Sequence, residues 1–487
     1  MNFIAIDLGT TNIKVGAFDQ KLNCLGYESL PVAYARSEAM VEFDAELYVS
    51  TIMDSIALMI DKKIITQTDT EQIIFTGQAE SLVLLDAEDK CLMNAISWLD
   101  ERSIEESKEI ASHFPVSEWY SKTGQQAVLP TWPATKVLWL RKHKPAIFSK
   151  VASFMMLKDF VAFRFCGKKA ADCSIATFSC YFDIFGKVYW KEMLEYLQIT
   201  ELQLPPLVEP GTVLGTLTKE AKHRSGLSCD TSINIGTLDH FAGMIGCGNV
   251  KEGSVSYSTG TVMALATIAN PSSYHNSTIS MHYGFLPDTY VMLPVAESGG
   301  ICLQWFRDRF LPNSSFRDID SEIVKRGSFN DIVFLPYLVG TNAPEFEVQA
   351  SGLFWNLRFK HDAYDMAYAV MEGVAHLLKK NCDEIRANNT RIDRIIATGG
   401  GAKSSLWCQL QADITGIPVV VPKQEEAACL GAAIMGAVSM GLFDTYEIDG
   451  VNTEFEREYL PRKNVMLETK IRQFAYLYEA SLKAQSL

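Results

Sequence analysis

Short apolar runs and small-residue turns alternate at the start of the chain. Phe3–Asp7 is apolar and ends in an aspartate, Gly9–Asn12 is a polar turn, and Ile13–Phe18 is apolar again. Two strand-like runs joined by such a turn predict a β-hairpin. The same order of strand, Gly/Thr turn and strand returns at residues 254–268. We interpret the two as a pseudo-repeat, in which each half of the chain opens on the same hairpin.

The remaining pattern alternates between helical and strand-like segments. Apolar residues at helical spacing predict a helix over residues 46–63. Further helices are expected at residues 101–111, 136–143, 363–385, 405–415 and 427–440. Short strands are expected at Ile73–Thr76, Ile233–Gly236, Arg394–Thr398 and Pro418–Pro422, whereas residues 201–216 are rich in Pro and Gly and predict a turn-rich connection. This alternation indicates the α/β class.

The length of 487 residues exceeds what one compact core accommodates, so we expect two large domains. The start of the second repeat places their boundary near residue 247. The prediction is therefore an N-terminal lobe over residues 1–247 and a C-terminal lobe over residues 248–487. A hydrophobic fraction of 48% with 21% charged residues is typical of globular domains with sizeable cores.

Net charge and cysteine usage exclude several classes of protein. A formal charge of −14 argues against a general nucleic-acid binder, which needs a basic face. The eleven cysteines are scattered without CxxC spacing, which favours reduced thiols over zinc or disulfides. The N-terminal residues resemble no signal peptide, and no apolar run reaches the ~20 residues of a membrane-spanning helix. We expect a cytoplasmic protein that binds no membrane.

The first small-residue turn carries candidate phosphate-binding chemistry. Gly9 allows close backbone approach to a ligand, while Thr10 and Thr11 supply hydroxyl and N–H groups for phosphate oxygens. Asp7, at the end of the strand, is a candidate ligand for a hydrated Mg²⁺. Lys14 either reaches a phosphate or is a surface lysine on the hairpin.

Two further turns have similar properties. Ser258–Thr261 repeats the Gly/Thr character of the first turn at the equivalent place in the second repeat. Gly399–Gly401 follows a predicted strand and precedes a predicted helix, where glycines allow a flat or charged ligand to approach. Three such turns in one chain favour a nucleotide-phosphate site over three ordinary turns.

Transfer of a phosphoryl group to an alcohol needs a base near the hydroxyl group. Asp239 is the candidate, because it follows a predicted strand and precedes a glycine-containing helix. Helix capping explains an aspartate at this position equally well. The residue pattern by itself leaves both interpretations open.

The order of these motifs resembles the FGGY carbohydrate kinases along essentially the whole chain. Lys136–His143 is similar to the first signature of the family, although Thr131 stands where an aromatic or small residue is usual. Gly352–Glu372 is similar to the second signature but departs from it at Asn356, where glycine is usual, and at Met371. Phe334–Gly340 resembles the strand and loop beside the active site of the family.

The resemblance implies two actin-like (ribonuclease H-like) lobes with a ligand cleft between them, and ATP and Mg²⁺ as cofactors. It implies that Asp239 is the catalytic base and that Asp7 meets the metal. The residues implied to bind ATP or its phosphates are Thr10, Thr11, Asn12, Lys14, Gly260, Thr261, Gly400, Gly401 and Ser404. Dimers are common in the family, so a homodimer is one expected assembly.

The substrate side is similar to two branches of the family. Gly77–Ser81 reads GQAES, where xylulokinases have GQMHG and glycerol kinases have NQRET. Gln78 fits both branches and Glu80 fits the second, while Ala79 differs from both. Trp98 resembles a substrate-facing tryptophan of glycerol kinases. His240 stands where xylulokinases have asparagine, and it either contacts substrate or caps the helix.

Three functions compete. We expect an ATP-dependent kinase that phosphorylates a hydroxyl group of a small sugar, foremost a ketopentose such as xylulose. A polyol, deoxyketose or aldonate kinase of the same family, of the glycerol, fuculose or gluconate type, is the nearest alternative. A non-catalytic actin-like regulator that binds ATP and sugar is an alternative from another class. Asp239 together with all three phosphate turns argues against it.

Overall fold

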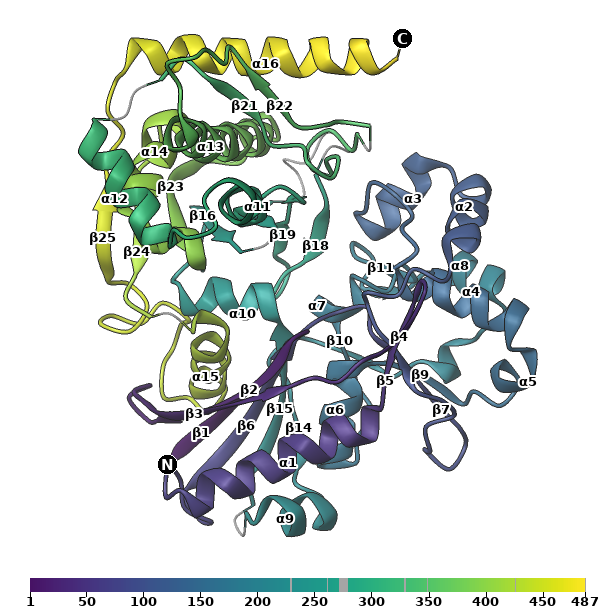
Figure 1. Ribbon diagram of the computed structural model, residues 1–487. Coiled ribbons are helices and arrows are strands. Elements are labelled where there is room, and N and C mark those ends of the chain that lie inside the picture. Colours follow the sequence, from purple (N-terminus) through teal and green to yellow (C-terminus); the bar gives the residue numbers. More distant parts are fainter. Residues whose placement is uncertain are drawn as a thin grey trace. The chain divides into compact units, whose positions relative to one another are not determined.

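A computed structural model describes residues 1–227, 230–260, 262–270, 279–327, 330–347, 349–424 and 426–486. The chain forms two compact units (Figure 1). Unit 1 comprises Met1–Gly248, Met281–Tyr290 and Glu426–Thr453, and unit 2 comprises Asn249–Ser280, Val291–Glu425 and Glu454–Leu487. Unit 1 is therefore assembled from three separate stretches of sequence. The segment 426–453, which lies in the predicted C-terminal lobe, belongs to the compact body of unit 1.

The main sheet of unit 1 has six strands in the order β14-β15-β6-β1-β2-β3. These strands are β1 (Asn2–Leu8), β2 (Asn12–Asp19), β3 (Cys24–Pro31), β6 (Thr70–Gly77), β14 (Val213–Thr216) and β15 (Ser232–Leu238). A second sheet has the order β4-β5-β8-β7-β9, formed by β4 (Ala35–Ser37), β5 (Met40–Phe43), β8 (Ala95–Ile96), β7 (Leu82–Leu85) and β9 (Ser153–Met156). Short strands complete the unit: β10 (Ala171–Asp172), β11 (Phe182–Asp183), β12 (Val188–Tyr189), β13 (Leu207–Val208) and β18 (Met281–Tyr283).

Unit 1 has helices on both faces of its main sheet and further helices that pack away from that sheet (Figure 1). They are α1 (Ala45–Asp61), α2 (Ile104–His113), α3 (Val116–Thr123), α4 (Pro133–His143), α5 (Pro145–Phe148), α6 (Leu157–Cys166), α7 (Cys173–Ala176), α8 (Lys191–Leu197), α9 (Lys219–Ser225), α10 (Asp239–Gly246) and α15 (Ala427–Ser439), with a 3₁₀ turn at Glu201–Gln203. Ile73 and Phe75 of β6 join the core beneath α1 and α6, while Ile74 lies against Gly436 of α15. The period-two alternation of the strand thus supplies both layers.

Helices α10 and α15 pack closely because glycine lies at their contact. A Cβ on Gly431 of α15 would lie 1.7 Å from the carbonyl oxygen of Ala242, and one on Gly246 of α10 would lie 1.9 Å from that of Ala427. Only glycine fits such an approach, because real Cβ contacts do not fall below about 3 Å. The position of α10, and of the Asp239 that begins it, therefore depends on α15.

Unit 2 repeats the opening topology of unit 1. Its main sheet contains the strand order β19-β17-β16-β23-β24-β25, and β20 also pairs with β17. The strands of the unit are β16 (Gly253–Thr259), β17 (Met263–Ala269), β19 (Tyr290–Met292), β20 (Val295–Ala296), β21 (Val333–Leu335), β22 (Leu353–Trp355), β23 (Ile392–Thr398), β24 (Val419–Pro422) and β25 (Phe455–Tyr459). Its helices are α11 (Gly300–Phe310), α12 (Phe316–Arg326), α13 (Ala363–Ala387), α14 (Ser405–Thr415) and α16 (Val465–Gln485), with a 3₁₀ turn at Gly400–Lys403.

The pseudo-repeat is confirmed by the strand pairing. In unit 1, β1 pairs antiparallel with β2 and parallel with β6. In unit 2, β16 pairs antiparallel with β17 and parallel with β23. The predicted α/β class is confirmed as well, whereas residues 201–216 hold β13 and β14 rather than turns alone. Among the described residues, no helix is both long and apolar enough to cross a membrane.

Candidate active site

The candidate site of unit 1 lies where three parallel strands end in register. Leu8, Gly77 and Leu238 are the last residues of β1, β6 and β15, and Gly77 pairs with both of the others. The residues that follow are the Gly9 turn, Gln78 and Asp239. The carboxyl ends of parallel strands are the usual place for ligands in α/β sheets. The fold therefore gathers most predicted residues of the N-terminal lobe at one edge.

Asp7 is the most perturbed of these residues. Burial and the neighbouring carboxylates of Asp239 and Glu426 raise the pKa of Asp7 to about 7, while the ammonium group of Lys14 opposes this shift. The Oδ1 atom of Asp7 is buried and has no hydrogen-bond partner among the described residues. Thr76, its register partner on β6, likewise has a buried Oγ1 without a partner in the described chain. A bound cation would give Oδ1 of Asp7 a partner and lower the pKa of Asp7.

Lys14 forms an ion pair that the sequence pattern did not indicate. Its Nζ lies 2.5 Å from Oε2 of Glu426, the residue before α15, and 412 residues separate the two in the chain. The side chains are 35% and 42% exposed, so the pair is open to solvent and to a ligand. The carboxylates of Glu426 and Asp7 raise the pKa of Lys14, which keeps it cationic. Lys14 remains available to an anion beside Asp7.

Asp239 is the first residue of α10 and is half-buried. Its Oδ1 accepts a hydrogen bond of 2.6 Å from the backbone N–H of His240. The residue before it, Leu238, occupies the cap position of the helix without a side-chain cap bond. The imidazole of His240 is exposed.

A chain of hydrogen bonds joins Gln78 to Trp98 and Thr10. The hydroxyl of Ser81 donates to Oε1 of Gln78 at 3.0 Å and accepts from the backbone N–H of Trp98 at 3.1 Å. The indole Nε1–H of Trp98 then donates to Oγ1 of Thr10 at 2.9 Å. Residues predicted for substrate and for phosphate are thus in direct contact. Ser81 was missed by the sequence, because a serine in a loop carries no specific signal.

Glu80 lies beside the buried Lys136, which the sequence indicated only as part of the first family signature. Lys136 on α4 is fully buried, and its Nζ donates to the backbone oxygens of Ser97 and Glu80 at 2.8 and 3.2 Å. Burial raises the pKa of the half-buried Glu80 to about 7 and lowers that of Lys136 to about 8, while the attraction between the two opposes both shifts. Ala79 is buried at the same turn. Lys136 therefore fixes the backbone at Glu80 and Ser97, and these backbone oxygens already engage its ammonium group.

Other predicted residues of the first turn are more open. Thr11 is exposed, and its backbone oxygen accepts from Val32 at 2.9 Å. Asn12 is half-buried at the start of β2. Tyr34 donates its hydroxyl to the backbone oxygen of Thr10 at 2.9 Å, and Tyr48 does the same to Gly9 at 3.3 Å. The two tyrosines fix the backbone of the turn and leave its side chains accessible.

In unit 2, glycines line the ends of β16 and β23. Ser258 and Thr398 pair in register, so Gly260 and Gly399 follow neighbouring strand ends. A Cβ on Gly260 would meet no atom within 4 Å, whereas one on Gly401 would lie 2.7 Å from Cβ of Thr259. Gly400 has only Thr259 at ordinary contact distance, 3.7 Å. The surface at Gly260 and Gly400 is therefore bare backbone, which suits a flat or anionic ligand.

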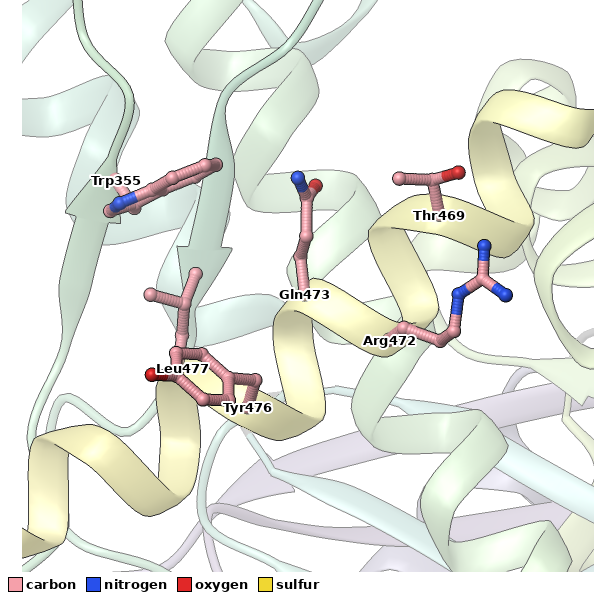
Figure 2. Close-up of a pocket in the computed structure, with 6 residues that line it drawn as sticks. All are labelled: Trp355, Thr469, Arg472, Gln473, Tyr476 and Leu477. Atoms are coloured by element: carbon pink, nitrogen blue, oxygen red, sulfur yellow. The ribbon is translucent and has the colours of Figure 1, made fainter.

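Two predicted residues of unit 2 fall outside this picture. Ser404 caps α14, because its Oγ accepts from the backbone N–H of Trp407 at 3.0 Å. Thr261 lies outside the described residues. A cavity of about 300 Å³ lies at β22 and α16, and none of the residues predicted for ATP or substrate lines it (Figure 2). Its walls include Trp355 and Leu477, which makes it largely apolar.

The chain is similar to known proteins in both sequence and structure. Two sequence profiles match: the FGGY family of carbohydrate kinases, N-terminal domain, over residues 2–246, and the C-terminal domain of the same family over residues 287–440. A xylulose kinase from Staphylococcus epidermidis is 30% identical over 448 residues, which cover 91% of this chain and 89% of the relative. The solved structure of a ligand-bound xylulose kinase from Lactobacillus acidophilus has a TM-score of 0.91 and 25% identity, covering 100% of this chain and 98% of the other. A gluconate kinase from the same organism has a TM-score of 0.90 and 25% identity, with coverage of 99% and 98%.

Proposed function

Because the chain belongs to the FGGY family of carbohydrate kinases, we propose that it transfers the γ-phosphoryl group of ATP to a ketopentose such as xylulose. The observation that carries the proposal is the set of in-register strand ends of β1, β6 and β15, which presents Asp7, Gln78 and Asp239 at one edge. Similarity to xylulose kinases over 91% of the chain supports the choice of acceptor.

Asp239 is the proposed general base. Its carboxylate is half-buried at the N-terminus of α10, where it can accept the proton of a sugar hydroxyl group while that oxygen attacks phosphorus. The proposed acceptor contacts are Gln78, Ala79, Glu80, Trp98 and His240, of which Trp98 offers an apolar face to the carbon atoms of the sugar. These contacts orient the hydroxyl group toward the base.

We assign the nucleotide contacts to the small-residue turns of the two units. In unit 1 we assign phosphate contacts to Thr10, Thr11, Asn12 and Lys14. In unit 2 we assign contacts to Gly260, Thr261, Gly400 and Gly401, and Ser404 supports the glycine turn by capping α14. Backbone N–H groups and one lysine suffice for a phosphate chain, so the acidic net charge of the protein is compatible with ATP.

Asp7 is the proposed ligand of Mg²⁺. Its buried Oδ1 without a partner among the described residues, and its raised pKa, fit a carboxylate that receives a cation. Mg²⁺ needs only one or two protein carboxylates because water and phosphate oxygens complete its coordination. When bound, the ion would neutralise charge on the phosphates. Asp7 would then stay ionised beside Asp239.

The charge around the acceptor residues favours a neutral acceptor over an aldonate. Burial and the carboxylates of Asp239 and Glu426 raise the pKa of Asp7, and Lys136 is engaged by backbone oxygens. With Lys14 assigned to phosphate, an anionic acceptor would meet these carboxylates without a lysine or arginine among the proposed acceptor contacts to balance it. Glu80, which matches glycerol kinases at this position, makes a neutral polyol the second candidate.

The test is a coupled assay of ADP release and sugar phosphate formation with xylulose, other ketopentoses, glycerol, other polyols and gluconate. We expect turnover with a ketopentose that Asp239→Asn abolishes and that the exposed control Asp61→Asn retains. Turnover confined to a polyol or an aldonate would refute the proposed acceptor and keep the reaction class. ATP binding without turnover of any acceptor would refute catalysis and support the regulator alternative.

A further inference from the structure

The strand that carries the proposed base is irregular just before it ends. The register of β15 against β6 shifts between Asn234 and Thr237, and Gly236 has φ of +69°. A Cβ on Gly236 would lie 1.5 Å from the carbonyl oxygen of Phe75, so no other residue fits. Such an irregularity changes the direction of a strand and is frequent next to active sites. It also leaves the strand end with fewer ladder bonds to hold it.

A buried lysine on α6 forms a hydrogen bond to this irregular segment. Lys158 is 0% exposed, and its Nζ donates to the backbone oxygen of Ile235 at 2.7 Å. The same Nζ lies 3.2 Å from Oδ2 of Asp172 and 3.4 Å from Oδ1 of Asp159. An ammonium group has three hydrogens, so these three oxygens account for all of them. Lys158 is thereby fixed on the residue before the bulge glycine.

A buried serine forms hydrogen bonds to the residues that follow the bulge. Oγ of Ser174 donates to Oδ2 of Asp172 at 2.7 Å, accepts from the backbone N–H of Leu238 at 3.2 Å, and lies 2.8 Å from Oγ1 of Thr237. The single hydroxyl hydrogen of Ser174 is used toward the carboxylate, so Thr237 must donate. The serine is fully satisfied and fully buried. Its partner Leu238 is the residue immediately before Asp239.

We propose that Lys158, Asp172 and Ser174 form a clamp that positions Asp239 for proton transfer. Asp172 links the lysine and the serine, because its Oδ2 contacts both Lys158 and Ser174. Burial raises the pKa of both carboxyl groups that face Lys158, which makes the network costly unless its geometry is kept. The clamp touches no reacting atom in this scheme; the proposal rests on the proposed role of Asp239 as base.

The experiment compares Ser174→Ala with Ser179→Ala. Ser179 is the matched control, since it is also fully buried and its Oγ accepts one backbone N–H, from Tyr181 at 3.2 Å, with no hydrogen bond to β15 among the described residues. Hydrogen–deuterium exchange of residues 235–241 measures the clamp independently of catalysis. Initial rates give kcat, KM and the ratio of ADP released to sugar phosphate formed.

We expect Ser174→Ala to accelerate exchange at residues 235–241, to lower kcat about tenfold or more, and to leave both KM values within about twofold. The ratio of ADP to sugar phosphate should rise above that of the wild type, because a misplaced Asp239 slows transfer to the sugar and lets water compete for the phosphoryl group. Asp172→Asn, which keeps the shape of the side chain, should show the same pattern more weakly. Ser179→Ala should leave exchange and the ratio unchanged.

Unchanged exchange at residues 235–241 in Ser174→Ala would overturn the clamp. Faster exchange with the kcat and product ratio of the wild type would overturn its positioning role. If the wild-type protein phosphorylates no acceptor, the proposed function fails and the role of Asp239 with it. The exchange data still separate that failure from a failure of the clamp.

Discussion

Substitution of Gly431 by alanine tests how strongly the contact between α15 and α10 determines unit 1. The added Cβ would lie 1.7 Å from the carbonyl oxygen of Ala242 and 2.8 Å from the backbone nitrogen of Gly246. Both are backbone atoms, so relief requires the helices to separate by about 1.5 Å or more. Overpacking costs about 1–3 kcal/mol, and a clash with backbone atoms places this contact at the upper end, while the better helix propensity of alanine returns about 1 kcal/mol. We expect a net loss of about 2 kcal/mol.

Gly243→Ala is the matched control on the facing helix. A Cβ there would meet no atom within 4 Å, so only the gain in helix propensity, up to about 1 kcal/mol, remains. Urea unfolding followed by tryptophan fluorescence should give a midpoint for Gly431→Ala lower by roughly 0.7 M, for a slope of about 3 kcal/mol per molar. Gly243→Ala should match or exceed the wild type. Equal midpoints for the two variants would refute the close contact.

Three further outcomes are expected. Burial raises the pKa of Asp159 from its ordinary value of 3.8 to about 7, so the folded chain keeps a proton that the unfolded chain loses. The free energy of unfolding should therefore fall as pH rises from about 4 to 7, and urea midpoints of Asp159→Asn should show a shallower fall. Trp98→Phe removes the 2.9 Å bond to Thr10 but keeps an aromatic face, so initial rates should show kcat/KM reduced by about two- to tenfold; an unchanged value would contradict the assigned contact. Lys14→Met breaks a partly exposed ion pair with Glu426, so stability should change by less than about 1 kcal/mol, while the KM for ATP rises clearly; a KM equal to that of the wild type would remove Lys14 from the phosphate site.

The local elements were predictable because their causes are local. The hairpin of β1 and β2 follows from two apolar runs around the Gly9 turn, and α14 occupies the predicted residues 405–415. The in-register strand ends that bear Asp7 and Asp239 follow from the parallel pairing of an α/β sheet. The assigned roles of these residues remain predictions.

The unpredicted features depend on contacts between distant segments. Lys136 is a lysine, a residue type that is usually exposed, yet it is completely buried and donates to backbone oxygens of Ser97 and Glu80. Glu426 carried no signal, because its partner Lys14 is 412 residues away. Ser174 is one serine among many until its hydroxyl reaches Leu238. Tertiary structure alone gives these residues their partners.

The split composition of unit 1 has a consequence for its biosynthesis. At about 5–20 residues per second, a ribosome takes roughly 10–35 s to pass from Gly248 to Glu426. During that interval β1 and β6 are complete but lack α15, so the face of the sheet on which Ile74 lies is covered only in part. The incomplete first unit therefore exposes hydrophobic surface of the kind that chaperones bind. The half of the enzyme that is made first can finish folding only after most of the second half has been translated.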